Sequence, residues 1–282
     1  MDGFADLHVH TQHSDGSLTV EEVLVLARER GMRAIAVSDH DTVAGVESAI
    51  ELGPRHGVEV VPAVEVSVTE RSHEYHVLGY GIDPREPVLL ALLARGRDAR
   101  KDTERALVAN LPAVGIDVTS EDLLAYRHDP ARGGWPLLNL LMDRGHVRDI
   151  AQYFSIFGPG KPGYAEYRGC TLAEAVAAIR GAGGLAVLAH PGHYWRLSPA
   201  AGLSEQDAER FVAAGIQGIE AHAVVHTPEE TERWTAFARA RGLLVTGGSD
   251  CHGRRMGAEP RLGKIKVGYD AVLALRERLP RA

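Results

Sequence analysis

The chain has 282 residues, of which 45% are hydrophobic and 24% charged, as in an ordinary globular protein. No apolar run approaches the roughly 18 to 20 residues of a membrane span, and the N-terminus lacks the features of a signal peptide. The formal net charge of −7 argues against binding of duplex nucleic acid, and two cysteines, Cys170 and Cys251, form no disulfide framework, so we expect a cytoplasmic protein.

Strand and helix signals alternate from the N-terminus, which is typical of βα units and a parallel sheet. Seven strands are predicted, at residues 5–10, 33–40, 58–68, 74–82, 184–190, 215–222 and 242–252. Helix starts are predicted at Thr19, which has a capping-box spacing with Glu22, and at Thr171, Ser204 and Thr227, with a further helix near 43–52. The most economical arrangement is an α/β fold, a distorted seven-stranded (β/α)7 TIM-like barrel, because closure removes exposed sheet edges.

Residues 84–170 interrupt the alternation with helical patterns and no convincing strand. We interpret this segment as a helical insertion or cap, and residues 1–83 and 171–282 as the barrel. Unlike the rest of the chain, the insertion has slightly more basic than acidic residues. A cap over an anionic substrate would have this balance, and so would a solvated helical surface.

The first predicted strand, within "DLHVHTQHSDG", carries three polar side chains with a spacing of two. Strand alternation would place Asp6, His8 and His10 on one face, looking into the barrel, and Ala5 and Leu7 on the other. Burying two imidazoles and a carboxylate without partners would be costly, whereas a metal ion satisfies them together.

Further metal-ligand side chains occur at or near the ends of the other strands. They are His40, Glu65, His76, His190, Asp250 and His252. In such barrels the C-terminal strand ends form the active site, so residues from distant segments converge there. Imidazole and carboxylate ligands without thiolate favour Zn, Mn or Fe(II) over Ca. Cys251, between two of these residues, is expected on the opposite face as a small core residue.

The chain resembles the PHP (polymerase and histidinol phosphatase) superfamily of metal-dependent phosphoesterases. The matching segments, in family order, are "DLHVHTQHSDG", "SDHDT", "PAVEVS", "HVLGYGID", "AHPG" and "GGSDCHG". The resemblance implies a distorted seven-stranded barrel with a trinuclear site of two to three divalent ions (Zn, Mn or Fe). It also implies three ligand sets, namely His8, His10, Glu65 and Asp250; Glu65, His76 and His190; and Asp15, His40 and His252.

One departure concerns the substrate. The nucleotide-acting branch, which the "SDG" form resembles, usually carries an Arg-x-His element that holds the substrate phosphate, and Gly134, Trp135 and Pro136 stand at its place here. We predict catalytic roles for Asp15, Glu65 and His193. Predicted substrate contacts are Arg132, Trp135, Arg196 and His226.

The expected activity is hydrolysis of a phosphate ester by a metal-activated water. The expected partner is a small phosphorylated substrate, which is a nucleotide, a short oligonucleotide or a phosphorylated metabolite. No association with a membrane is expected. One alternative is an amidohydrolase, which commonly bridges two metals with a carboxylated Lys; the four lysines, Lys101, Lys161, Lys264 and Lys266, lie at no mid-barrel strand end. The other is a non-catalytic accessory domain that binds metal or a partner.

Overall fold

The computed structural model describes residues 3–197, 203–255 and 258–280, without the side chains of 195–197. Its strands are β1 (Phe4–Val9), β2 (Met32–Val37), β3 (Glu59–Glu70), β4 (His73–Tyr80), β5 (Cys170–Thr171), β6 (Leu185–Leu188), β7 (Gly218–Ala223), β8 (Leu244–Gly248) and β9 (Val267–Gly268). Its α-helices are α1 (Val20–Glu29), α2 (Val46–His56), α3 (Pro87–Asn110), α4 (Ser120–Ala125), α5 (Pro136–Asp143), α6 (Ile150–Phe157), α7 (Leu172–Gly181), α8 (Pro191–Leu197), α9 (Glu205–Ala213), α10 (Pro228–Ala240) and α11 (Asp270–Arg278). Two 3₁₀ helices, η1 (Leu111–Val114) and η2 (Pro130–Arg132), lie between α3 and α5.

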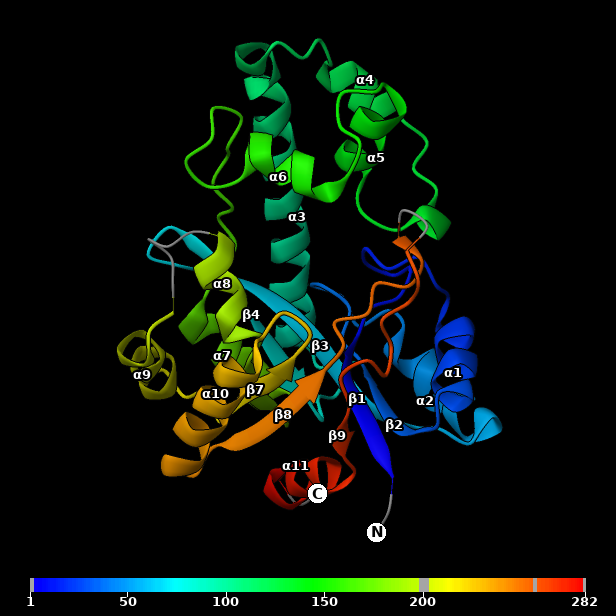
Figure 1. Ribbon diagram of the computed structural model, residues 1–282, viewed down its shortest axis with the longest axis vertical. Coiled ribbons are helices and arrows are strands. Elements are labelled where there is room, and N and C mark those ends of the chain that lie inside the picture. Colours follow the sequence, from blue (N-terminus) through cyan, green and yellow to red (C-terminus); the bar gives the residue numbers. More distant parts are fainter. Residues whose placement is uncertain (1–2, 198–202, 256–257, 281–282) are drawn as a thin grey trace.

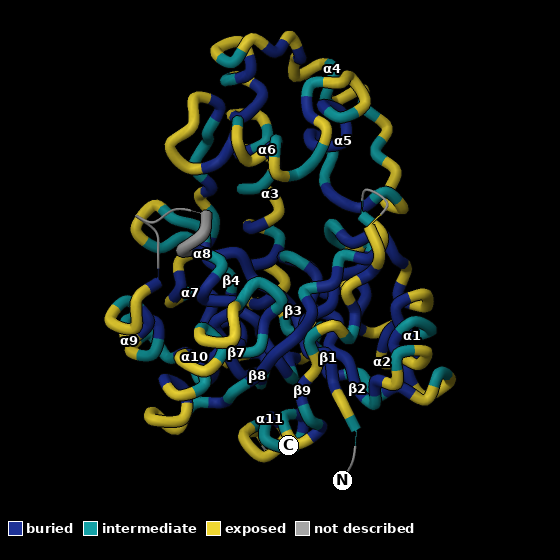
Figure 2. The backbone as a smooth tube through the Cα atoms, in the orientation of Figure 1, coloured by how far each residue is buried: buried dark blue, intermediate teal, exposed yellow. Residues whose placement is uncertain are grey.

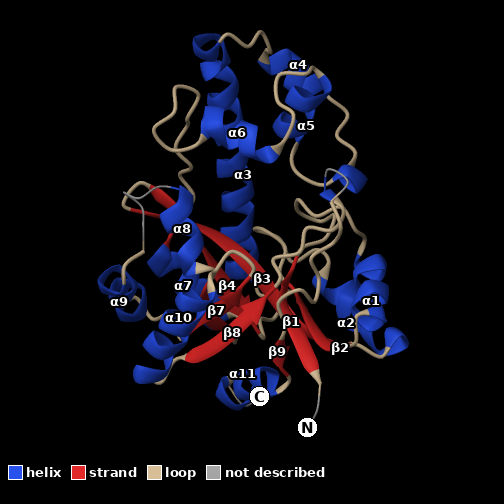
Figure 3. Ribbon diagram, viewed as in Figure 1, coloured by secondary structure: helices blue, strands red, loops and turns tan. Residues whose placement is uncertain are grey.

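The strands form one curved sheet that nearly closes into a barrel. Eight strands follow the order β8-β7-β6-β4-β3-β2-β1-β9, and β5 pairs with β3. At the seam, Val9 of β1 forms a parallel bridge with Cys251, just after β8. Gly248 makes this approach possible, because a Cβ there would lie 2.4 Å from His8 Cβ. Figure 3 shows the strands at the centre of the lower part of the molecule, with helices around them.

The predicted strands are all present, but the prediction of a wholly parallel sheet is wrong for β4. This strand pairs antiparallel with β3 and with β6. It follows β3 through a two-residue turn, Arg71 and Ser72, both with positive φ (49° and 62°). So tight a turn can only return the chain antiparallel, whereas a parallel connection needs a longer crossover. The short strands β5 and β9 were not predicted.

The predicted alternation along β1 is also interrupted. The pairing of β1 with β2 shifts register between Asp6 and Val9. Leu7 therefore packs in a buried cluster with Ala63 and Leu78. Asp6 does not join the two histidines of the strand; its carboxylate accepts the backbone N–H of Ser249 at 2.8 Å and that of Gly263 at 2.7 Å. A bulge of this kind re-aims side chains at a barrel rim.

The helix starts follow the local sequence signals. Capping boxes are formed at all four predicted positions, which are Thr19, Thr171, Ser204 and Thr227. The helix predicted near 43–52 begins later, at Val46, and Gly45 before it provides no side-chain cap. A capping box is a contact within four residues, so the sequence alone determines it.

The segment between β4 and β5 is helical, as predicted, and stands above the barrel (Figure 1). Helix α3 runs through both regions: Leu89 and Leu93 belong to the barrel core, whereas Leu107 belongs to a separate buried cluster in the insertion. Figure 2 shows buried residues in both regions. None of the helices within the described residues is long and apolar enough to span a membrane.

Candidate metal centre

The nine side chains predicted as metal ligands lie together at one end of the barrel. Their donor atoms form groups in which all members lie within 4.8 Å of one another; the groups are His10, Asp15, His40 and His252; His8, His10, Glu65 and Asp250; His40, Glu65 and His76; and His8, His190 and Glu220. Shared members join these groups into one cluster. Of the ten residues, Glu220 was not predicted.

Glu65 lies at the middle of the cluster, fully buried on β3. Its Oε2 lies 3.1 Å from His8 Nε2, 3.3 Å from His10 Nε2 and 3.1 Å from His40 Nδ1. Its Oε1 lies 3.1 Å from His76 Nδ1 and 3.0 Å from His190 Nε2. One carboxylate thus faces five imidazoles from four different segments of the chain.

Two aspartates complete the cluster. Asp250 follows β8 in a left-handed backbone conformation (φ 49°), and its Oδ1 lies 3.2 Å from His10 Nε2. Asp15 Oδ1 lies 3.2 Å from His252 Nε2. The loop that carries Asp15 is held by Asp39, whose carboxylate accepts the N–H of Thr11 at 2.7 Å. This contact orients the loop between β1 and α1.

The donor atoms of the cluster fit a metal centre better than a network of hydrogen bonds. Among the described residues, several of its buried side-chain atoms have no hydrogen-bond partner; they include His8 Nε2, both ring nitrogens of His10, Asp15 Oδ1, His40 Nδ1, Glu65 Oε2 and His76 Nδ1. Leaving such groups unsatisfied in a buried site is costly, and cations bound among them would remove that cost. Imidazole and carboxylate donors suit Zn, Mn and Fe.

Burial and mutual charge act strongly on the ionisation of the cluster. Burial alone would raise the pKa of Glu65, but the imidazoles of His8 and His40 hold it well below its usual range. Burial would lower the pKa of His10, but the carboxylates of Asp250 and Glu65, 3.2 and 3.3 Å from its Nε2, raise it to about 9. Burial does prevail at His40, whose pKa it lowers to about 3. The carboxylates are therefore ionised and available to cations.

Two further carboxylates orient histidines of the cluster. Glu220 on β7 accepts from His8 Nδ1 at 2.9 Å. Glu74 on β4 lies 3.3 Å from His76 Nε2 and pairs with Arg100 of α3. Neither was predicted, although a Glu within the apolar stretch of β7 is itself a signal, because buried carboxylates nearly always have partners. Arg100 has no such signal, since it lies in a helix with mixed charges.

The predicted catalytic residue His193 lies beside the cluster, with its ring centroid 5.4 Å from that of His190. Burial lowers its pKa to about 3, so its imidazole is neutral. Of the predicted substrate contacts, Arg196 falls in α8, and its side chain lies outside the described residues.

The other predicted substrate contacts have partners within the protein. Arg132 forms a bidentate pair with Asp143, with both distances 2.8 Å. Trp135 packs edge to face on Tyr153 within the insertion. His226 accepts the N–H of Gly192 at Nε2 (2.9 Å), and its Nδ1 lies 2.8 Å from the carbonyl oxygen of Ala221. These contacts use both ring nitrogens of His226, so the ring ties α8 to the end of β7.

A different arginine lies at the edge of the cluster. Arg255 Nη1 lies 2.8 Å from Asp15 Oδ2, so its guanidinium stands directly behind a cluster carboxylate. The insertion meets the same point: an added Cβ at Gly133 would lie 3.1 Å from the carbonyl oxygen of Asp15 and 3.3 Å from Arg255 Cβ. Because Gly133 and Gly134 have no side chains, they leave room for Arg255.

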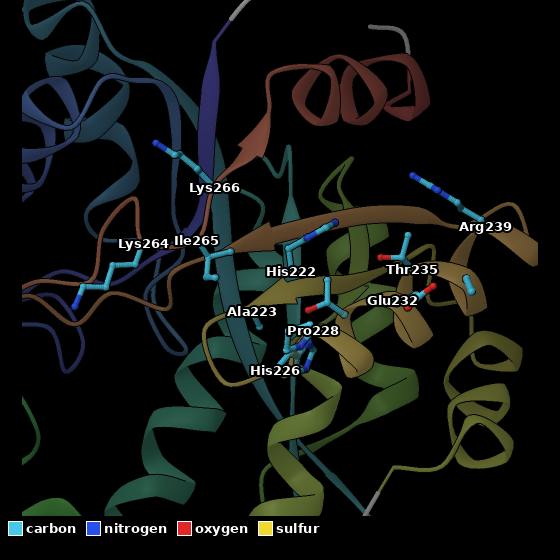
Figure 4. A pocket seen from close by; sticks show the side chains of 12 residues that line it. His222, Ala223, His226, Pro228, Glu232, Thr235, Arg239, Lys264, Ile265 and Lys266 are labelled. Carbon is cyan, nitrogen blue, oxygen red and sulfur yellow. The ribbon is translucent and has the colours of Figure 1, made fainter.

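A separate hollow of about 790 Å³ lies between β7, α10 and residues 264–266 (Figure 4). His222, Arg239, Lys264 and Lys266 are among its lining residues. In Figure 4 the charged ends of Arg239, Lys264 and Lys266 lie well apart, so they do not form a common anion site.

Known proteins resemble this chain over most of its length. Residues 6–109 match the PHP domain family. The chain is 37% identical over 249 residues to the 3',5'-nucleoside bisphosphate phosphatase of Chromobacterium violaceum, covering 88% of this chain and 86% of that protein. It is 31% identical over 254 residues to the 5'-3' exoribonuclease Rnm of Escherichia coli, covering 88% and 84%. A solved structure from Bifidobacterium adolescentis, of a protein inferred to be a metal-dependent phosphoesterase, aligns with a TM-score of 0.84 at 28% identity, covering 98% of this chain and 96% of that one. The chain therefore belongs to the PHP family and is a metal-dependent phosphoesterase.

Proposed function

We propose that this enzyme hydrolyses a phosphate ester bond of a nucleotide or short oligonucleotide at a centre of two to three divalent ions. The position of Glu65 carries the proposal, because one buried carboxylate faces five imidazoles that have few other partners. The substrate class rests on the two relatives, which are named as a nucleoside bisphosphate phosphatase and an exoribonuclease. These names favour phosphoester hydrolysis over both the amidohydrolase and the non-catalytic alternative.

In this proposal the nine predicted residues would hold the ions, with Glu65 at the middle of the cluster and Asp15 in the group with His10, His40 and His252. When bound, Zn, Mn or Fe ions lower the pKa of a coordinated water and polarise phosphoryl oxygens. The protein fixes the donors in a buried site, where their interactions with charge are stronger than in water.

We assign the substrate phosphate to the space between the cluster and the insertion. Arg255 stands at that edge, and a guanidinium binds phosphate oxygens in a bidentate geometry that Lys does not match. His193, neutral and beside His190, is placed to donate a hydrogen bond to an oxygen of the substrate. Residues 1–83 and 171–282 would form the catalytic barrel, with 84–170 as its cap.

The test is phosphate release from a panel of nucleoside mono- and bisphosphates, short oligonucleotides and sugar phosphates, with Mn²⁺, Zn²⁺ or Fe²⁺ added to chelator-treated protein. We expect activity on nucleotide substrates that depends on the added metal. Glu65→Gln should abolish it, while Glu59→Gln, on the same strand but paired with Arg276 and Tyr269, should not. A protein that binds these metals but cleaves none of the esters would refute the proposal.

A further inference from the structure

Glu220 is a fully buried carboxylate in the interior of β7, and both of its oxygens have partners. Oε1 lies 2.9 Å from His8 Nδ1, and Oε2 accepts the backbone N–H of His190 at 2.8 Å. Its two partners come from β1 and from the end of β6. Glu220 therefore connects two histidines of the cluster without facing Glu65 itself.

The contact with His8 determines which ring nitrogen is available to a metal. Nε2 of His8 faces the cluster, 3.1 Å from Glu65 Oε2 and 3.5 Å from Asp250 Oδ1. A carboxylate opposite Nδ1 favours the tautomer with its proton on Nδ1. The lone pair of Nε2 is then directed into the cluster, and the basicity of the ring is increased.

The contact with His190 acts on the backbone. His190 has a φ of +24°, a value that residues other than glycine rarely adopt. This conformation places its Nε2 at 3.0 Å from Glu65 Oε1. By accepting the N–H of His190, Glu220 stabilises the strained backbone conformation in which the ring reaches the cluster.

We infer that Glu220 is a positioning residue of the metal centre, which sets metal affinity by orienting His8 and His190 and does not itself bind an ion. The inference rests on the proposed function, since it requires that the cluster holds metal. A direct ligand role is disfavoured because both oxygens already have partners in the protein. Oε2 accepts the backbone N–H of His190, and Oε1 lies at Nδ1 of His8, the ring nitrogen that points away from Glu65. Outer carboxylates of this kind commonly change metal affinity 10- to 100-fold.

The decisive variant is Glu220→Gln, which preserves size. Both partners of Glu220 donate, whereas an amide offers one oxygen and one NH₂, so one of the two contacts must be lost. We expect the affinity of chelator-treated protein for Mn²⁺, measured by calorimetric titration, to fall roughly 10- to 100-fold with an unchanged number of ions per chain. The visible absorption of bound Co²⁺ should also shift, because the ligands change orientation.

Two further variants separate positioning from general stability. Glu59→Gln, at a barrel strand but away from the cluster, should leave Mn²⁺ affinity and the Co²⁺ spectrum as in the wild type. Glu220→Asp keeps the charge and both acceptor oxygens on a shorter side chain, so its affinity should lie between those of the wild type and Glu220→Gln. If Glu220→Gln does not fold, the Mn²⁺ affinity of Glu220→Asp tests the inference in its place.

Two results would overturn the inference. Wild-type Mn²⁺ affinity in Glu220→Gln would show that the contacts do not matter to the metal, and loss of one ion per chain would show that Glu220 is itself a ligand. Failure of the wild-type protein to bind any of the metals would instead refute the proposed function.

Discussion

The backbone N–H of Gly134 donates to the carbonyl oxygen of Asp15 at 2.7 Å, so the insertion rests directly on the loop that supplies a predicted metal ligand. Next to it, Gly133 has a positive φ of 66°, and the space for its side chain is occupied by Asp15, Ser17 and Arg255. The position of the insertion at Gly133 and Gly134 therefore affects the position of Asp15 and its donor group.

Substituting Gly133 should disturb this contact. In Gly133→Ala the added Cβ would lie 3.1 Å from the Asp15 carbonyl oxygen, in a backbone conformation that costs roughly 1–3 kcal/mol without glycine. We expect lower stability in urea and weaker Mn²⁺ binding. Gly115→Ala is the control, since Gly115 has a φ of 74° and no atom within 4 Å of an added Cβ. Equal metal affinity in the two variants would contradict the expectation.

Arg255 and Arg132 should differ sharply in their effect on catalysis. Loss of a charge-assisted contact to phosphate costs about 1.5–3 kcal/mol, so Arg255→Ala should lower kcat/KM by roughly 10- to 100-fold, mainly through KM. Arg255→Lys, which keeps the charge beside Asp15 but not the bidentate geometry, should recover part of the loss. Arg132 is already paired with Asp143, so Arg132→Ala should leave kcat/KM within a few-fold of the wild type. Steady-state kinetics on the best nucleotide substrate decides, and the reverse order of effects would refute the assignment of Arg255.

Metal binding should release protons at pH 7.5. Despite burial, the contacts with Glu65 and its neighbours raise the pKa of His10 to about 9 and that of His76 to about 10, so both are protonated in the metal-free protein at this pH. Ligation requires neutral imidazole, so metal affinity should increase as the pH rises toward 9. Calorimetry in two buffers with different ionisation enthalpies measures the number of protons. Binding without proton release would contradict these pKa values.

The same shifts predict the pH dependence of the metal-free protein. A histidine whose pKa rises from 6.5 to about 9 on folding takes up a proton between these values. Its stabilising contribution is therefore complete below pH 6.5 and is lost as the pH rises through 9. Thermal unfolding of chelator-treated protein should show a lower Tm at pH 9 than at pH 6.5, and addition of Mn²⁺ should reduce or reverse the difference. A metal-free Tm that increases over this range would contradict the prediction.

The features that the sequence predicted correctly depend on local patterns. The helix start at Thr19 needs only Glu22, and the grouping of the predicted ligands in one place follows from strand ends that lie on one side of a barrel. The direction of β4 depends instead on the turn at Arg71 and Ser72, where neither residue is of the type that usually marks positive φ. The position of Asp6 depends on a bulge against β2, which nothing in β1 itself indicates.

The residues that support the cluster were missed for a different reason. Glu220, Glu74 and Arg255 contact predicted ligands but lie outside the motifs that carry them, so no motif spacing identifies them. Arg132 and His226, in contrast, were predicted as phosphate contacts because of residue type, and the structure gives both of them partners inside the protein. Residue type predicts what a side chain can bind, and packing decides whether it is available.

The pair of Arg100 and Glu74 should couple the insertion helix to the centre. Contact with Arg100, together with the hydrogen bond from His76, holds the pKa of Glu74 well below its usual range against the opposing effect of burial. This lowered pKa contributes stability above about pH 4.5 that is lost on acidification below it. Arg100→Met, which keeps the apolar stem, should therefore destabilise the protein by about 1–2 kcal/mol at pH 7, a value reduced from that of a fully buried pair because both side chains are partly exposed. The difference from the wild type in urea unfolding should shrink toward pH 4.

Arg95→Met is the control, since Arg95 lies on the same helix but pairs with Glu174 at the surface, where ion pairs contribute little. Because Glu74 also holds His76 Nε2 at 3.3 Å, Arg100→Met but not Arg95→Met should weaken Mn²⁺ binding, and equal effects of the two variants on metal affinity would show that α3 is not coupled to the centre.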